Sequence, residues 1–378
     1  MAKTRFILAV PLVLLVGCAA PTRRSWKKAP LPPDWDAEPG AFAEAAAAPA
    51  PAVTVPDHPA GPGNGPSFSE PPPPPATGQI PGLSLPATGM ISLNQWAAQK
   101  QLGAVRLRPL HPPAYSVPTR FGVFTVRPNS LSAFWGQVEV RLGFPPELAG
   151  DQIYLHTLDV QKILEPLANG ESVALPATRL VVVDPGHGGT HTGTRNIVTG
   201  RYEKDYTLDW ALRLAPLLRQ TGWRVLLTRT NDVTLSLADR VAFAEAHHAD
   251  LFLSLHFNST GSGNGLPAGL ETYYLPPVGM PSSITRGYAD DLHASFPNNA
   301  YDTQNFYYAL RLHTALLTVN GGKDRGVRRA RFLNVLSGQQ RPAVLIEGGY
   351  LSNPTEARQI ADPAYRQKLA LAVAQALE

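Results

Sequence analysis

The chain has 378 residues, 44% of them hydrophobic and 16% charged, so it can form two or three ordinary domains with a sizeable core. Its 33 Lys and Arg residues exceed the 29 Asp and Glu residues by four, which is too small and too scattered an excess to predict nucleic-acid binding. The single cysteine, Cys18, excludes an intramolecular disulfide and any cysteine-based zinc or iron–sulfur site.

Residues 1–17 have the pattern of a targeting segment. A basic stub precedes an apolar run from Phe6 to Val16, which is too short to span a bilayer as a mature helix. The run ends in Leu15-Val16-Gly17-Cys18, and there the sequence resembles a bacterial lipoprotein signal peptide. The resemblance implies cleavage before Cys18, acylation of that cysteine and a periplasmic chain held at the membrane, with Ala19 favouring the outer membrane. The alternative is an ordinary signal peptide that is cut nearby.

Residues 18–90 are expected to form a disordered tether. Eighteen of the 38 prolines lie between positions 21 and 90, among Ala and Gly residues. Such a stretch has too little apolar surface to offset chain entropy. A coil of 70 residues spans roughly 45–50 Å, which suits a tether from a membrane into an adjacent layer. A generic spacer without a target is the alternative.

Residues 91–175 are expected to form a small β-rich α+β domain. The segments Phe121–Arg127 and Gln137–Leu142 alternate with a period of two, as half-buried strands do, and Leu158–Leu167 has the pattern of a short amphipathic helix. The region resembles the stalk-like domains beside some cell-wall hydrolases and copper amine oxidases. It contains no catalytic constellation, so we favour a packing or spacer role over wall binding or dimerisation.

Residues 176–378 alternate between strand and helix patterns. The expected strands are Leu180–Val183, Trp223–Leu227, Leu251–His256, Leu270–Leu275, Arg331–Leu336 and Ala343–Ile346. The expected helices are Lys204–Gln220, Leu237–His247, Tyr307–Val319 and Pro363–Leu377. This alternation predicts a three-layer α/β domain with a mostly parallel central sheet flanked by helices. In such sheets, functional sites form outside the carboxyl ends of the strands.

Three of the apolar strands end in polar residues with useful chemistry. His187 lies in the Gly-rich turn Asp184-Pro-Gly-His-Gly-Gly, His256 ends a second strand, and Glu347 ends a third. Two histidines and a carboxylate with an open position are what a catalytic zinc requires. The third ligand is best sought in Glu203, although the helix dipole would equally explain an acid in a first turn. Glu347 suits a general base beside the metal.

The chain resembles the zinc-dependent N-acetylmuramoyl-L-alanine amidases of the AmiC type (Amidase_3) over about 200 residues. The resemblance rests on the turn around His187 and on three further blocks, which are Glu203-Lys-Asp, Ser-Leu-His-Phe-Asn and Val-Leu-Ile-Glu-Gly-Gly-Tyr-Leu-Ser-Asn. The resemblance implies that His187, Glu203 and His256 bind one Zn²⁺ and that Glu347 is the catalytic acid and base. It implies hydrolysis of the amide between N-acetylmuramic acid and L-alanine of peptidoglycan, in wall remodelling or daughter-cell separation. The alternatives are a noncatalytic peptidoglycan-binding protein that keeps the fold, and a zinc peptidase acting on the stem peptide.

One block departs from the family pattern. After Gly189 the family commonly has Asp and then a Gly-Ala pair, whereas in this chain Thr190-His191 precedes Gly193-Thr194. His191 is therefore a candidate extra ligand, although we favour a solvent-facing loop histidine. Other histidines are expected to be structural, either against helix C-terminal carbonyls or in an apolar helix pattern: His247, His248 and His313.

Two further segments could shape the substrate site. The insert Pro276–Asn305 is a candidate lid, because some relatives carry there a helix that blocks the zinc site until a partner protein removes it. A plain surface excursion is favoured, and the sequence identifies no activator. The candidates for substrate binding are Asn258, Arg325 and Arg328, the arginines belonging to a basic cluster with Lys323, Arg329 and Arg331. The cluster could meet stem-peptide carboxylates, or it could be solvated charge.

Overall fold

The computed structural model of the chain describes residues 89–170, 175–260, 267–284, 290–320 and 323–378. The expected signal peptide, Cys18 and all but the last two residues of the expected tether therefore lie outside the described residues. Within the described part, no helix is both long and apolar enough to cross a membrane.

The first described region is built mainly of short antiparallel strands. Strands β2 to β6 form a meander in chain order, and β1, β8 and β7 form a separate three-stranded sheet. Both predicted strands and the predicted helix are confirmed, with shifted ends. The elements are β1 (Met90–Ser92), α1 (Leu93–Gln99), β2 (Arg106–Arg108), β3 (Ala114–Pro118), β4 (Val123–Val126), β5 (Ser132–Trp135), β6 (Val138–Arg141), β7 (Glu147–Ala149), β8 (Gln152–His156), α2 (Thr157–Asp159), η1 (Val160–Leu164) and α3 (Glu165–Asn169).

The second region contains the alternating strands and helices that the sequence predicts. The elements before the insert are β9 (Leu180–Pro185), α4 (Glu203–Gln220), β10 (Arg224–Leu227), α5 (Leu237–Ala246), β11 (Leu251–Asn258) and β12 (Leu270–Tyr274). Those that follow are η2 (Pro297–Tyr301), α6 (Asp302–Asn320), β13 (Asp324–Arg329), α7 (Asn334–Ser337), β14 (Ala343–Tyr350), α8 (Pro354–Ala361) and α9 (Pro363–Ala376).

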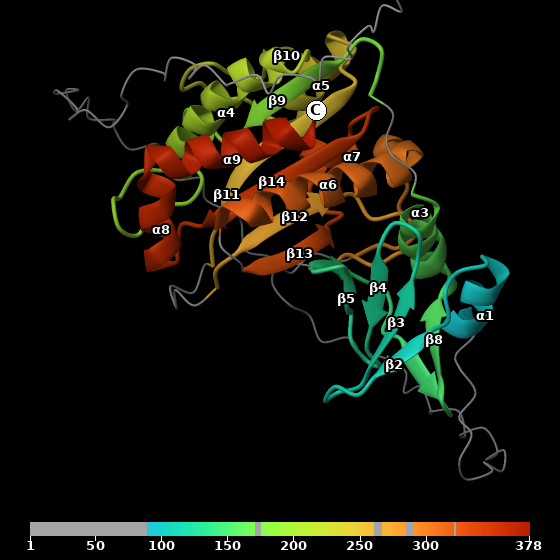
Figure 1. The fold of residues 1–378 in the computed structure, drawn as a ribbon. Coiled ribbons are helices and arrows are strands. Elements are labelled where there is room, and N and C mark those ends of the chain that lie inside the picture. Colours follow the sequence, from blue (N-terminus) through green and yellow to red (C-terminus); the bar gives the residue numbers. More distant parts are fainter. Residues whose placement is uncertain (1–88, 171–174, 261–266, 285–289, 321–322) are drawn as a thin grey trace, which may run out of the picture. The chain divides into compact units, whose positions relative to one another are not determined.

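The strands of this region lie side by side in the order β10-β9-β11-β14-β12-β13 (Figure 1). Four of the five strand pairs are parallel, and only β12 and β14 pair antiparallel, so β12 and β13 run against the other four. The predicted mostly parallel sheet is confirmed. The three strands expected to carry His187, His256 and Glu347 are direct neighbours, since β9, β11 and β14 are consecutive in the sheet.

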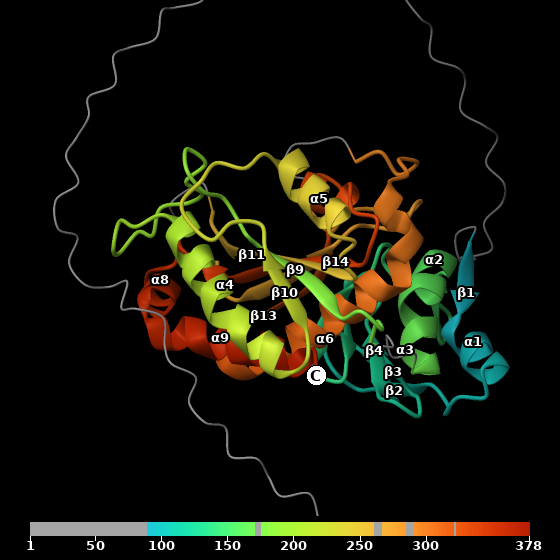
Figure 2. The ribbon, with the colours of Figure 1, turned by 90° about the horizontal axis from the view of Figure 1, so that it is seen from above.

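Helices cover both faces of this sheet, so the domain has three layers. Helices α4, α6 and α9 cover one face, and α5 lies on the other (Figure 2). The alternating residues of β9 show this directly, because Val181 and Val183 pack into the first core whereas Leu180 and Val182 pack into the second, with residues of α5 and α7. This pattern is typical of a strand that is buried on both faces.

One predicted strand is wrong. Arg331–Leu336 is not a strand, because β13 occupies Asp324–Arg329 and α7 begins at Asn334. The charged residues of β13 concealed it from a reading based on apolar runs. Its arginines nevertheless lie in the sheet, where Arg329 is fully buried and donates to the carbonyl oxygen of Arg141.

The described residues of the 276–305 insert lie where a plain surface excursion, favoured over a lid from the sequence, would lie. Because β12 is antiparallel to β14, with Glu271 opposite Glu347 and Tyr273 opposite Leu345, the insert leaves β12 at the sheet edge away from Glu347. There the described residues contact the end of β13: Ser283 N donates to the carbonyl oxygen of Arg329 at 2.7 Å. These contacts favour a plain surface excursion over a lid.

Candidate metal centre

His187 follows β9 in a turn of unusual backbone conformation. Its φ of 63° lies in the left-handed region, which non-glycine residues rarely adopt. The residue before it must be glycine, since a Cβ on Gly186 would lie 2.2 Å from the imidazole ring of His256. The turn therefore brings the backbone of β9 directly against the second histidine.

Two buried arginines hold this turn in place. Arg240 of α5 donates to the carbonyl oxygen of His187 at 2.7 Å and to Asp184 at 2.6 Å. Arg229 donates to the carbonyl oxygens of Pro185 at 3.0 Å and Gly186 at 2.9 Å. The sequence reasoning missed both, because an arginine in a helix or after a strand normally reads as solvent-exposed charge.

Glu203 is the first residue of α4, and it is almost fully buried beside the two histidines. Its Oε1 lies 3.0 Å from His187 Nε2 and 3.0 Å from His256 Nδ1. The backbone N–H of Thr194 donates to Oε2 at 3.1 Å. Burial alone would raise the pKa of Glu203, but its hydrogen bonds to both histidines hold the pKa well below its ordinary value. The carboxylate is therefore ionised.

The structure brings the three predicted ligands together from β9, α4 and β11. One ligand atom from each of His187, Glu203 and His256 lies within 4.8 Å of the others. The two imidazole rings meet edge to face, with centroids 4.9 Å apart. Two nitrogens and one carboxylate oxygen converging in this way can hold a single metal ion.

The other histidines behave largely as expected. His191 is exposed and does not belong to this group of three, although it lines the neighbouring pocket. Nδ1 of His247 lies 2.7 Å from the carbonyl oxygen of Phe243 in the last turn of α5. His313 is fully buried, with Nε2 2.9 Å from Asp324 and Nδ1 3.0 Å from Thr272, which confirms a structural role.

Glu347 lies in the strand next to His256. The two residues are register partners in β11 and β14, and Glu347 is also the register partner of Glu271 in β12. Register partners point to the same face of a sheet, so the three side chains form a row across three strands. Glu347 is only 8% exposed. The predicted general base therefore lies one strand, about 4.8 Å, from a predicted ligand.

The candidate substrate-binding residues gather around Glu271, which the sequence reasoning did not single out. Asn258 Nδ2 donates to its carboxylate at 2.6 Å, and Arg325 Nε donates at 2.8 Å. Arg328 Nε lies 3.5 Å away, and the hydroxyl of Tyr273 donates at 2.9 Å. The sequence did offer a signal for Glu271, because it is a charged residue that directly follows Leu270 inside a predicted strand. We call Glu271, Asn258, Arg325 and Arg328 the Glu271 cluster.

The predicted basic cluster does not form one surface. Arg325 and Arg328 face Glu271, whereas Arg329 is fully buried and Arg331 forms an ion pair with Asp290 of the insert. Successive residues of a strand point to opposite faces, which separates Arg328 from Arg329.

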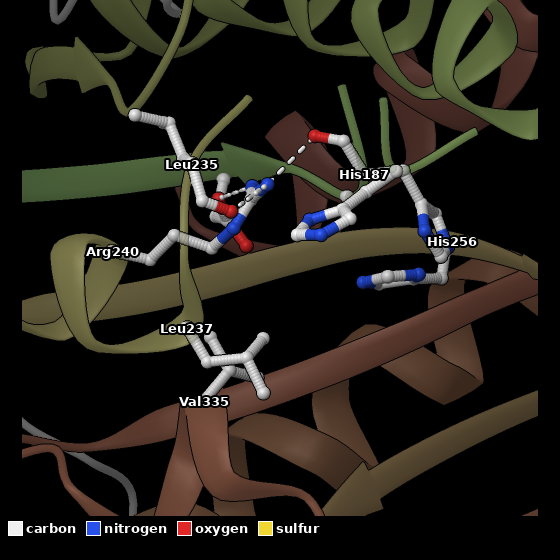
Figure 3. A pocket seen from close by; sticks show the side chains of 9 residues that line it. His187, Leu235, Leu237, Arg240, His256 and Val335 are labelled. Carbon is white, nitrogen blue, oxygen red and sulfur yellow. Dashed lines mark hydrogen bonds and ion pairs between the residues drawn. The ribbon is translucent and has the colours of Figure 1, made fainter. Parts of the chain in front are cut away.

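A pocket of about 290 Å³ lies beside the two histidines. His187 and His256 lie on one side of it, and the apolar side chains of Leu237 and Val335 lie across from them (Figure 3). Arg240 reaches into the same region from α5, where it bonds to the backbone of His187. The charged residues lining the pocket, Asp184 and Arg240, are paired with each other at 2.6 Å.

Comparison with known families identifies this domain. The profile of the N-acetylmuramoyl-L-alanine amidase family, Amidase_3, matches residues 181–378, which is just over half of the chain. The matched segment begins one residue into β9 and contains every residue of the candidate metal centre together with Glu347. The chain belongs to this family.

Individual relatives match the same half of the chain. The N-acetylmuramoyl-L-alanine amidase CwlM of Bacillus licheniformis is 34% identical over 192 residues, which are 50% of this chain and 64% of that protein. The amidase AmiA of Salmonella typhimurium is 32% identical over 219 residues, covering 52% of this chain and 74% of that protein. This chain thus spans slightly under two thirds of the first relative.

Solved structures align over a similar share of the chain. The catalytic domain of the amidase CwlV from Bacillus (Paenibacillus) polymyxa is 32% identical, with a TM-score of 0.43, and covers 52% of this chain and 95% of that one. An N-acetylmuramoyl-L-alanine amidase from Clostridium difficile 630 is 30% identical, with a TM-score of 0.44, covering 53% and 95%.

Proposed function

We propose that this protein is a zinc-dependent N-acetylmuramoyl-L-alanine amidase that hydrolyses the amide between N-acetylmuramic acid and L-alanine of peptidoglycan. The observation that carries the proposal is the convergence of His187, Glu203 and His256, with Glu347 in the adjacent strand. Family membership names the bond, and the geometry supplies the groups that its hydrolysis requires.

The residues present fit a single zinc ion. The donors are two imidazole nitrogens and one carboxylate oxygen, the combination found in catalytic zinc sites that keep a position for substrate or water. Glu203 is held ionised by its neighbours, and backbone N–H groups fix the orientation of its carboxylate. A bound zinc ion would supply Lewis-acid polarisation of the amide carbonyl and would acidify water.

The remaining steps belong to the protein. Glu347 takes the proton from the attacking water and returns it to the nitrogen of the leaving L-alanine, which is general base and then general acid catalysis. Its position beside His256 keeps it near the reacting atoms. Arg240 and Arg229 hold the turn that positions His187. The chemistry needs no nucleophilic serine or cysteine.

The alternatives fit less well. A noncatalytic wall-binding protein would have no reason to keep His187, Glu203, His256 and Glu347 together, so the grouping of the first three and the pairing of His256 with Glu347 support an enzyme. A stem-peptide peptidase would use the same metal chemistry, so only identification of the products separates it from an amidase.

We also propose a cellular setting for this reaction. Cleavage before Cys18 and acylation of that cysteine would tether the chain in the periplasm, with the outer membrane favoured over the inner, for wall remodelling or daughter-cell separation. The domain boundaries would be 1–17, 18–90, 91–175 and 176–378, and the family match from residue 181 supports the last.

The lipid anchor is tested by growing cells with radiolabelled fatty acid, which should be incorporated into the wild type and not into Cys18→Ser. Incorporation of the label into both proteins would refute a lipid anchor at Cys18.

The central experiment digests purified sacculi with the zinc-loaded chain and identifies the products by mass spectrometry. We expect stem peptides that begin with L-alanine, and we expect their release to stop when zinc is chelated and to return when zinc is restored. Shortened stem peptides still joined to muramic acid would instead establish a peptidase. Sacculi that bind the intact protein without any product would favour the wall-binding alternative.

A further inference from the structure

We propose that Arg325, positioned by Glu271, binds the α-carboxylate of the second residue of the stem peptide, so that the enzyme distinguishes this carboxylate from its amidated form. This inference rests on the proposed amidase function and deepens it. It concerns the part of the same sheet edge that lies beyond Glu347 as seen from the histidines.

Strand order places the Glu271 cluster beside the reaction site. The row of register partners runs from His256 through Glu347 to Glu271, so Glu271 lies one strand past the proposed acid and base. Arg325 comes from β13 and reaches back toward this row. Its guanidinium bonds to Glu271 at 2.8 Å and lies 5.2 Å from the ring centroid of Tyr350, which belongs to the same strand as Glu347.

Within the Glu271 cluster, Arg325 is the residue that solvent reaches. Its side chain is 32% exposed, compared with 13% for Arg328 and 2% for Glu271. Asn258 is also buried, and its amide donates to Glu271. Arg328 and Asn258 therefore brace Glu271, Glu271 orients Arg325, and Arg325 presents its outer face to a ligand.

The chemistry of this arrangement selects an anion. A guanidinium has five N–H donors in a planar fork, and the bond from Nε to Glu271 uses only part of them. Fixed by Glu271 and by the Tyr350 ring, the fork is oriented before the ligand arrives, and a planar carboxylate is the group that it pairs with best.

Distances along the substrate agree with this assignment. Adjacent strands are about 4.8 Å apart, so β13 lies two spacings, or about 9.6 Å, from the strand of Glu347. The guanidinium of Arg325 reaches back from β13 to Glu271 in the strand between them. A carboxylate on the second residue of the stem peptide is about 7 Å from the scissile nitrogen, at about 3.5 Å per residue. A peptide whose first amide lies at Glu347 and which crosses toward β13 brings that carboxylate to Arg325.

The opposite side of the metal centre suits the other half of the substrate. The pocket beside His187 and His256 has apolar walls from Leu235, Leu237 and Val335, and its Asp184 and Arg240 neutralise each other. It fits the uncharged lactyl and sugar part. The substrate therefore lies across the strand ends with its glycan over β9 and its anionic peptide over β12 and β13.

The test compares two soluble glycan substrates that are identical except at the second stem-peptide residue, which carries either a free α-carboxylate or a carboxamide. We expect the zinc-loaded wild type to have a kcat/KM about 10-fold or more higher for the acid form. Arg325→Gln should remove this preference. Arg325→Lys should restore part of it, because the charge returns without the planar fork.

Two further variants test whether Glu271 acts by positioning Arg325 or whether any lost charge on this domain weakens the preference. Glu271→Gln should raise KM for the acid form while changing kcat little, because it loosens Arg325 without touching the reacting atoms. Arg311→Gln, which removes an exposed arginine of α6, should keep the full preference.

Equal cleavage of both forms by the wild type, or a preference that survives Arg325→Gln, would overturn the inference and leave the amidase function standing. Cleavage of neither form by the zinc-loaded wild type would overturn the amidase function itself, and the inference with it.

Discussion

Glu203 in the amidase-family region and Asp159 in the preceding β-rich region are two carboxylates with nearly the same burial and opposite electrostatics. Glu203 is 3% exposed and Asp159 is 0% exposed. Burial raises the pKa of Asp159 to about 6, against the opposing effects of Arg329 and of the N–H groups of Gly143 and Phe144. The pKa of Glu203 instead falls well below its ordinary value, despite burial.

Their partners account for the difference. Asp159 receives backbone N–H groups at 2.6 and 3.0 Å, whereas Glu203 has an imidazole nitrogen at 3.0 Å on each of two sides. Hydrogen bonds and charge interactions from two imidazoles at contact distance outweigh desolvation of Glu203. For Asp159, the charge of Arg329 and two backbone N–H groups do not outweigh it. The amidase-family region thus keeps a buried anion between two imidazoles, and the β-rich region uses a buried acid to hold a turn.

Removing the buried anion of the site should have the largest effect. Glu203→Gln is expected to lose tight zinc binding and to reduce amidase activity by about 10³-fold or more, because a neutral amide replaces the anionic ligand. Zinc content measured by mass spectrometry should fall in parallel with activity. His247→Ala, which removes an exposed histidine at the end of α5, should retain both. Full zinc occupancy in Glu203→Gln would exclude Glu203 as a ligand.

Removing the second carboxylate of the site should leave zinc in place. Glu347→Gln is expected to lower kcat by about 10²–10⁴-fold, since the amide cannot accept the proton of the attacking water. The readout is product release from sacculi together with zinc content. Near-normal kcat would show that another group moves the proton.

A geometric change in the site should have a smaller effect. In Gly186→Ala the new methyl group would lie 2.2 Å from the His256 ring, so the ring must shift. We expect kcat/KM to fall about 10²-fold, the cost of displacing a reacting group by about 1 Å. The circular dichroism spectrum should be unchanged. Unaltered kinetics would mean that the ring of His256 can move without consequence.

The small-domain carboxylate should affect stability rather than activity. Because the pKa of Asp159 in the folded chain is raised to about 6, its contribution to stability is greatest below pH 4 and is lost as pH rises through 6. Wild type should lose about 2–3 kcal/mol relative to Asp159→Asn between pH 4 and 7. Parallel pH profiles of unfolding free energy for the two proteins would contradict this, and amidase activity should be the same in both.

Much of the candidate site could be predicted from local patterns. The apolar runs ending in His187, His256 and Glu347 are long enough to identify strands buried on both faces, and polar residues at their ends mark a sheet edge. The register of His256 with Glu347 agrees with that prediction. Glu203 required family resemblance, since an acid at the start of a helix is ordinary.

The features that could not be predicted from the sequence depend on contacts between residues that are distant in the chain. β13 was missed because its charges are compensated by Glu271 and by backbone carbonyls from other segments. The lid stayed an open alternative because the direction of β12 is not encoded in its apolar pattern. Arg229 and Arg240 were missed because nothing near them in the chain marks the turn that they hold.

By itself, the sequence determined most of the segments that become strands and helices and the polar residues that end β9, β11 and β14, because hydrophobic period and run length are local properties. Only the tertiary structure decided that β12 runs against β14, that the polar row lies on the face covered by α5 and α7, and that Glu271 joins Arg325 beside Glu347. These features follow from strand order and direction, which are set by packing between residues far apart in the chain.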